Sequence, residues 1–290
     1  MARCQEIGKY FEAAKKLTLE AGEVFKAAIV SEKTVETKRD KWDLLTQYDN
    51  QIETLLVSGL SAMFPDHKFI AEESVSRDAK LPELTDAPTW FIDPIDGTTN
   101  FVHKFSQCCI SIGLTVCKRL ELGIIYNPTN GEMYSAVRGE GAFLNGKPIK
   151  TSGVSKLNKS LVNVEVTEIR PSKNHDIALA RLEAFVSAAE GVRCIGSAAL
   201  GLAYIASGNM DAFEMEFLGP WDVAAGRLIV EEAGGTVLDL RGGPHDVMKP
   251  KTTAAATEGL AKEISKLIVE TDLQTQRKRL KRVPSSSKLL

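Results

Sequence analysis

Acidic side chains and a threonine gather around a sharp turn at residues 93–100, DPIDGTTN. Asp93 ends an apolar run, and Asp96 follows on a turn that Pro94 and Gly97 favour. Two carboxylates this close repel each other unless a cation lies between them. Carboxylate and carbonyl oxygens suit Mg²⁺, so the turn is a candidate metal site. Taken alone, the same residues could form an ordinary Asp-Gly turn on the surface.

Two further acidic segments favour the metal-site interpretation. Glu72-Glu73-Ser74 closes a preceding apolar run, which would place a pair of carboxylates at a sheet edge. Asp222 follows Trp221 at the predicted start of a helix, where it could also be a simple N-cap. Phosphate ester hydrolysis needs charge neutralised on the transferring group and an activated water, which bound metal ions supply.

Together these segments resemble the inositol monophosphatase family of Mg²⁺-dependent, lithium-sensitive phosphatases. The family motif D-P-[IL]-D-G-T-x-N matches residues 93–100, and W-D-x-A-A-G followed by E-A-G-G matches 221–226 and 232–235. Two separated motifs in the right order are more specific than either alone. The resemblance runs from about residue 5 to 270. Ala71 and Phe217-Leu218 depart from it where the family commonly has Gly, beside the expected site.

The resemblance implies two or three Mg²⁺ ions per site and direct attack by water, with no covalent intermediate. The implied metal ligands are Glu73, Asp93, the backbone carbonyl of Ile95, Asp96 and Asp222. Asp93 would be shared by two ions. Thr98, hydrogen-bonded towards Glu73, would orient the water and take its proton. Glu73, Asp93 and Thr98 are therefore the predicted catalytic residues.

The resemblance also implies how substrate is held. The backbone N–H groups of residues 97–99 should open a helix and bind phosphate oxygens. Glu214 would accept hydrogen bonds from substrate hydroxyls, and residues 196–198 would face the ring. The residues predicted to bind substrate are Glu73, Ile95, Asp96, Gly97, Thr98, Gly196, Ser197, Ala198, Glu214 and Asp222. Asp49 corresponds to a family residue near a weaker metal, although a helical Asp is usually on a solvated face.

The predicted reaction is hydrolysis of inositol monophosphate to inositol and phosphate. The alternative is another small phosphorylated sugar or nucleotide, such as galactose 1-phosphate or fructose 1,6-bisphosphate. A haloacid-dehalogenase phosphatase would separate its two acids by one residue, whereas Pro94 and Ile95 separate them here. A non-catalytic metal-binding scaffold is a further alternative, but no expected acid is missing. No Ser-His-Asp nucleophile elbow and no metal-spaced histidine pair occur.

Composition is typical of a soluble globular protein, with 43% hydrophobic and 26% charged residues. The net charge of −2 gives no field that would attract nucleic acid or a membrane surface. No apolar run approaches the roughly 18–20 residues that a membrane span needs. Five cysteines without a C-x-x-C pair indicate thiols in a reducing compartment, so we expect a cytoplasmic protein. The resemblance implies a homodimer.

Hydrophobic spacing predicts intermixed helices and strands, with a hairpin at Asn130-Gly131 and another turn at Asn145-Gly146. The pattern indicates an α/β fold that layers helices on mixed and antiparallel sheets, like that of fructose-1,6-bisphosphatase. Residues 1–272 should form one catalytic domain, and the basic, Ser-rich residues 273–290 a disordered tail. Helices are expected at 4–28, 46–63, 176–190, 198–207, 222–233 and 258–270. Strands are expected at 68–71, 89–93, 109–116, 122–126, 132–137, 160–166, 192–195, 212–215 and 236–240.

Overall fold

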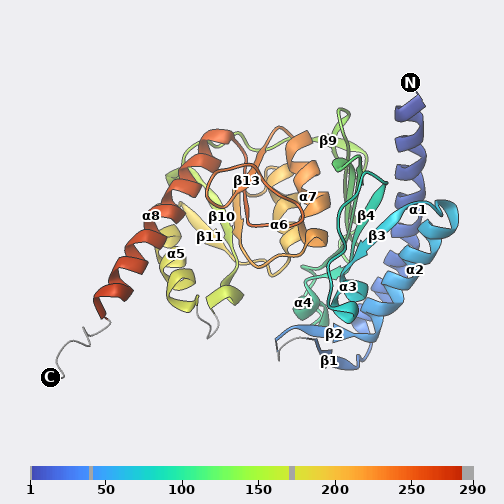
Figure 1. The fold of residues 1–290 in the computed structure, drawn as a ribbon, viewed down its shortest axis with the longest axis horizontal. Helices are drawn as coiled ribbons and strands as arrows, with labels where there is room; N and C mark the ends of the chain where they lie inside the picture. Colours follow the sequence, from blue (N-terminus) through green and yellow to red (C-terminus); the bar gives the residue numbers. More distant parts are fainter. Residues whose placement is uncertain (1, 39–41, 170–173, 283–290) are drawn as a thin grey trace.

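The protein, described by a computed structural model over residues 2–38, 42–169 and 174–282, alternates helical and sheet layers (Figure 1). The helices are α1 (Ala2–Val30), α2 (Gln47–Met63), α3 (Glu72–Asp78), α4 (Thr98–Val102), α5 (His175–Ala188), α6 (Ala198–Ala206), α7 (Pro220–Glu232) and α8 (Glu258–Arg282). Helices α1 and α2 cover one face of the larger sheet, α6 and α7 lie between the two sheets, and α5 and α8 cover the smaller sheet. This arrangement confirms the predicted layered fold.

Both sheets are mixed. The larger has seven strands in the order β3-β4-β5-β6-β7-β8-β9, with only the β3–β4 pair parallel. Its strands are β3 (Lys68–Ala71), β4 (Thr89–Asp96), β5 (Cys109–Val116), β6 (Arg119–Asn127), β7 (Glu132–Val137), β8 (Gly141–Leu144) and β9 (Lys147–Ile149). The smaller has the order β11-β10-β12-β14-β13. Its strands are β10 (Leu161–Val164), β11 (Gly191–Arg193), β12 (Ala212–Met215), β13 (Thr236–Asp239) and β14 (Thr252–Ala255).

Helix α7 packs unusually close to the larger sheet because small residues face each other there. A Cβ atom added at Gly123 would lie 2.7 Å from the carbonyl oxygen of Ala225, and one at Gly113 would lie 2.8 Å from the Cβ of Ala224. Only glycine in the strands leaves room for this approach. As a result, the first turn of α7, which carries Asp222, is held against the sheet that carries Asp93.

The structure departs from the predicted elements at several places. Helix α8 continues to Arg282, so residues 273–282 are helical and the expected disordered tail is wrong over that stretch. Residues 283–290, the rest of that prediction, lie outside the described residues. Strand β10 ends at Val164 and short helical turns follow it at Val166–Ile169. The antiparallel pair β1 (Val35–Thr37) and β2 (Leu44–Thr46), helix α3 and strand β14 were not predicted.

Candidate active site

Three carboxylates from two separate segments meet between the larger sheet and α7. Asp93, Asp96 and Asp222 offer oxygen atoms that all lie within 4.8 Å of one another. The β4–β5 register shifts between Asp93 and Asp96, which re-aims the end of the strand. Gly97 follows with a positive φ of 88° and turns the chain into α4. The turn predicted from the sequence therefore does bring its acids to one point.

The carboxylate of Asp96 is fixed by the beginning of α6. Its oxygens accept the backbone N–H of Ala199 at 2.8 Å and of Ala198 at 3.3 Å, and the Ser197 hydroxyl donates to it as well. A helix N-terminus favours a negative charge, which lowers the cost of burying this group. Asn100 joins the same segments, since its amide donates to the carbonyl of Ile195 at 2.9 Å. In this structure Ser197, predicted to face the substrate ring, positions Asp96.

Asp93 and Asp222 are anchored by backbone groups. Asp93 accepts the N–H of Ile95 at 3.0 Å, and Asp222 accepts the N–H of Gly219 at 2.6 Å. Burial is the main cause that raises the pKa of both carboxyls well above the ordinary value, and repulsion from neighbouring acids such as Asp96 adds to it. Closely spaced acids resist ionisation when no cation is nearby, and a bound cation stabilises their ionised form. This donor set therefore fits a hard metal ion.

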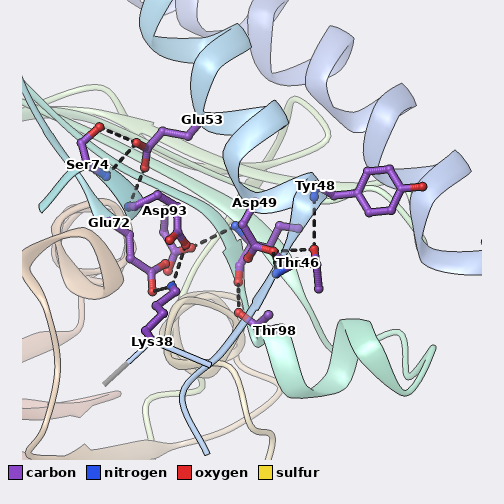
Figure 2. A network of polar contacts seen from close by, with 11 residues as sticks. Lys38, Thr46, Tyr48, Asp49, Glu53, Glu72, Ser74, Asp93 and Thr98 are labelled. Atoms are coloured by element: carbon purple, nitrogen blue, oxygen red, sulfur yellow. Dashed lines mark hydrogen bonds and ion pairs between the residues drawn. The ribbon is translucent and has the colours of Figure 1, made fainter. Parts of the chain in front are cut away.

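A second acidic group lies beside the first (Figure 2). The ammonium of Lys38 contacts Glu72 at 2.7 Å and Glu73 at 2.6 Å, and its side chain is only 5% exposed. Burial, with repulsion from Glu72, raises the pKa of Glu73 to about 8. The role of Glu73 as a metal ligand stays a prediction, since its carboxylate pairs with Lys38 in this structure. Lys38 was missed because nothing in the surrounding sequence links it to acids 34 and 35 positions away.

Two side chains near these acids differ from the predictions, one in its hydrogen bond and the other in its burial. The Thr98 hydroxyl donates to the carbonyl of Ile95 at 3.1 Å, whereas the resemblance implied a bond towards Glu73. Asp49 is fully buried, so the solvated-face interpretation is wrong. Its Oδ2 accepts the N–H of Thr46 at 2.8 Å, and its Oδ1 has no hydrogen-bond partner in the described part of the chain. Burial raises the pKa of Asp49 to about 6.

Asp96 and Asp222 line a cleft of about 410 Å³. Of the predicted substrate-binding residues, those lining it are Asp96, Gly97, Thr98, Gly196, Ser197, Ala198 and Asp222. Glu165, which sequence reasoning missed, also lines it, as does Met215. Glu214 does not belong with this group: it is 3% exposed and pairs with Arg181 at 3.2 Å. The contact predicted between Glu214 and substrate hydroxyls stays a prediction.

An acidic cluster at a strand-to-helix turn, beside a small cleft, could hold the metal ions that phosphate ester hydrolysis uses. The chain belongs to the inositol monophosphatase family, whose description matches residues 7–272. It is 44% identical to human inositol monophosphatase 2 over 259 residues, covering 89% of this chain and 90% of that protein. Membership excludes the haloacid-dehalogenase and non-catalytic alternatives.

Solved structures agree with this assignment. An inositol monophosphatase from Anabaena is 30% identical, covers 91% of this chain and 97% of its own, and superposes with a TM-score of 0.77. SaIMPase-II with inositol monophosphate bound is 25% identical, covers 94% of this chain and 99% of its own, and also has a TM-score of 0.77. Within the described residues, no helix has both the length and the apolar character to cross a membrane.

Proposed function

We propose that this chain hydrolyses inositol monophosphate to inositol and phosphate, using Mg²⁺ held by the buried acids. The observation that carries the proposal is the convergence of Asp93, Asp96 and Asp222 within 4.8 Å, with Asp96 and Asp222 lining the cleft. The names of the relatives and the inositol monophosphate bound to SaIMPase-II support this choice over galactose 1-phosphate or a nucleotide.

The acids would divide between two or three ions. Glu73, Asp93 and the carbonyl of Ile95 would hold one, and Asp93 would share the second with Asp96 and Asp222. Bound Mg²⁺ would neutralise the phosphate oxygens and lower the pKa of the attacking water. Backbone N–H groups of Ile95, Ala198 and Ala199 hold the carboxylates of Asp93 and Asp96 in place, which would preorganise them for the ions.

The protein would contribute orientation and proton transfer. The backbone N–H groups that open α4 at residues 97–99 would bind the phosphate oxygens. Thr98 is held with its hydroxyl on the Ile95 carbonyl, next to the acids, where it would orient the water and pass on its proton. Gly196 and Ala198 line the cleft on the α6 side, where the inositol ring would lie.

The remaining features are part of the same proposal. Residues 1–272 would form the catalytic domain, and the protein would act as a cytoplasmic homodimer. Li⁺ should inhibit uncompetitively, because it would replace an ion in a late complex without excluding the ester. Size-exclusion chromatography with light scattering tests the dimer. Initial rates at several LiCl concentrations, with ionic strength matched by KCl, test the inhibition.

The decisive experiment is a phosphate-release screen with inositol 1-phosphate, galactose 1-phosphate, a nucleoside monophosphate and fructose 1,6-bisphosphate. We expect turnover of inositol 1-phosphate that requires Mg²⁺ and stops with EDTA. Asp93→Asn should lower kcat by orders of magnitude, while Asp66→Asn, on an exposed turn, serves as the matched control. Full activity of Asp93→Asn, or a clear preference for another ester, would reject the proposal.

A further inference from the structure

Positive charge is concentrated near one end of the chain, although the net charge is only −2. Residues 277–282 read RKRLKR, so all but one of them are lysine or arginine, and no acidic residue occurs after Asp272. Because this basic segment contributes so many positive charges, the rest of the chain is distinctly acidic. Such asymmetry is typical of chains that bind a polyanionic partner through one basic segment.

Helix α8 holds the basic segment as the continuation of a firmly anchored helix. Ile268 belongs to the buried core that fixes α8 to the smaller sheet, and Asp272 pairs with Arg181 of α5 at 2.8 Å. Thr275 is still buried, whereas every side chain from 276 to 280 is exposed or half-exposed. This part of α8 lies at the edge of the molecule (Figure 1). The fold therefore presents these residues to their surroundings on an ordered helix.

Two exposed leucines lie among the charges of this helix. Leu273 is 47% exposed and Leu280 is 75% exposed. Leu273, Arg277 and Leu280 are four and three residues apart, which places them on the same face of α8. Arg279 is turned towards α5, where it pairs with Asp176 at 3.2 Å. The phosphates of a nucleic acid would attract the cations but leave both leucines in water, whereas the acyl chains of a bilayer would bury them.

We propose that the end of α8 docks on an anionic lipid surface, with its cations at the headgroups and Leu273 and Leu280 in the outer layer of the acyl chains. Amphipathic helices with about four to eight lysines and arginines bind membranes that contain phosphatidylserine, because each cation near the surface adds attraction. The helix would lie on the membrane, as basic amphipathic helices do. The inference goes beyond the proposed reaction and does not depend on it, since the acids of the candidate site lie on α7 and the larger sheet.

The test is co-sedimentation of the full-length chain with vesicles of phosphatidylcholine and phosphatidylserine in a three-to-one ratio, with pure phosphatidylcholine vesicles as the reference. We expect binding to the anionic vesicles only, and weaker binding as KCl is raised, because salt screens exposed charges. Arg277→Gln combined with Lys278→Gln should lower the ratio of bound to free protein about thirtyfold, since two cations near the surface are lost. Leu280→Ser should lower it about tenfold, because an apolar side chain leaves the acyl layer.

The matched control is Lys118→Gln combined with Arg119→Gln. These residues form an exposed lysine–arginine pair at the turn between β5 and β6, so the change in charge is the same. Vesicle binding of this variant should equal that of the wild type. Circular dichroism of every variant shows whether it folds. Binding is measured without substrate, so its outcome is independent of the proposed phosphatase reaction.

A short DNA duplex in the same buffer separates a lipid site from a general polyanion site. Tighter binding to the duplex than to the anionic vesicles would overturn the inference, as would unchanged vesicle binding of Leu280→Ser. So would a wild type that ignores the anionic vesicles or binds neutral vesicles equally well. A loss of less than about threefold in the Arg277 and Lys278 double variant would show that these cations do not face the membrane.

Discussion

The carboxylate of Glu53, on α2, accepts the backbone N–H of Glu73 at 2.7 Å (Figure 2). It also accepts the N–H of Ser74 at 2.9 Å and the Ser74 hydroxyl at 2.6 Å. Ala71, at the N-cap of α3, has no side chain that could satisfy these donors. Glu53 therefore caps α3 from another helix, and in doing so it sets where the candidate metal ligand Glu73 lies.

Glu53→Gln should raise the Mg²⁺ concentration needed for half-maximal activity several-fold. The amide keeps the size of the side chain but loses the charge that favours a helix N-terminus, so the stability should also fall by about 1 kcal/mol. Activity against Mg²⁺ concentration and a thermal melt measure the two effects. Glu20→Gln, at an exposed position on α1, is the matched control. An unchanged Mg²⁺ requirement would show that Glu53 only stabilises the fold.

Thr98→Ala should lower kcat by about 10²-fold and change KM little, because a proton-transferring hydroxyl acts in the transition state. Steady-state rates on inositol 1-phosphate separate the two parameters. Thr99→Ala is the neighbouring comparison, since residue 99 would act through its backbone N–H and should lose much less. If Thr98→Ala raises KM alone, the hydroxyl binds substrate and does not take part in proton transfer.

The acidic site should make metal binding depend on pH. Burial raises the pKa of Asp96 to about 6 and, with repulsion from Glu72, that of Glu73 to about 8. The unfolded chain releases these protons near pH 4, whereas the metal-free folded chain keeps them, so its stability should fall as pH rises from about 4 to 8. Mg²⁺ needs ionised carboxylates. The difference in Tm between Mg²⁺ and EDTA should therefore grow between pH 5 and 8.

Asp93→Asn provides the check on this pH dependence. Removing the shared carboxylate should reduce the Mg²⁺-induced rise in Tm at pH 8, where the wild-type effect is largest. A wild-type rise that is constant from pH 5 to 8 would contradict the raised pKa values of the site. Calorimetric titration with Mg²⁺ in two buffers of different ionisation enthalpy counts the protons released.

The candidate metal-binding turn was predictable because its residues lie close together in the sequence. Asp93, Asp96 and Gly97 form one short segment, and the turn propensity of Pro and Gly makes their convergence a local matter. The same holds for α2, whose N-cap Thr46 and capping-box Asp49 lie in the sequence pattern. Strands β3 and β12 were also predicted with their observed bounds.

What the sequence could not supply were contacts between distant segments. Lys38 and Glu53 reach the site only once α2, β1 and α3 pack together, and neither lies in a chemical motif. The pairing of Glu214 with Arg181 of α5, at 3.2 Å, is another contact between distant segments that no local pattern indicates.

The Arg181 cluster gives a final prediction about stability. Arg181→Met would remove the cation shared by Glu214, Glu216 and Asp272, although Glu216 would keep its ion pair with Lys251 at 2.7 Å. Breaking a buried ion pair by removing one partner costs about 3–5 kcal/mol, which corresponds to a drop of roughly 10 °C in Tm. Buried carboxyls that lose a neighbouring positive charge have raised pKa values, so the loss should be larger at pH 8 than at pH 5, where they can be protonated. Arg193→Met, at an exposed position on β11, should change Tm little at either pH. A loss for Arg181→Met that is equal at both pH values would mean that packing of the arginine stem, and not its charge, stabilises this junction of α5, β12 and α8.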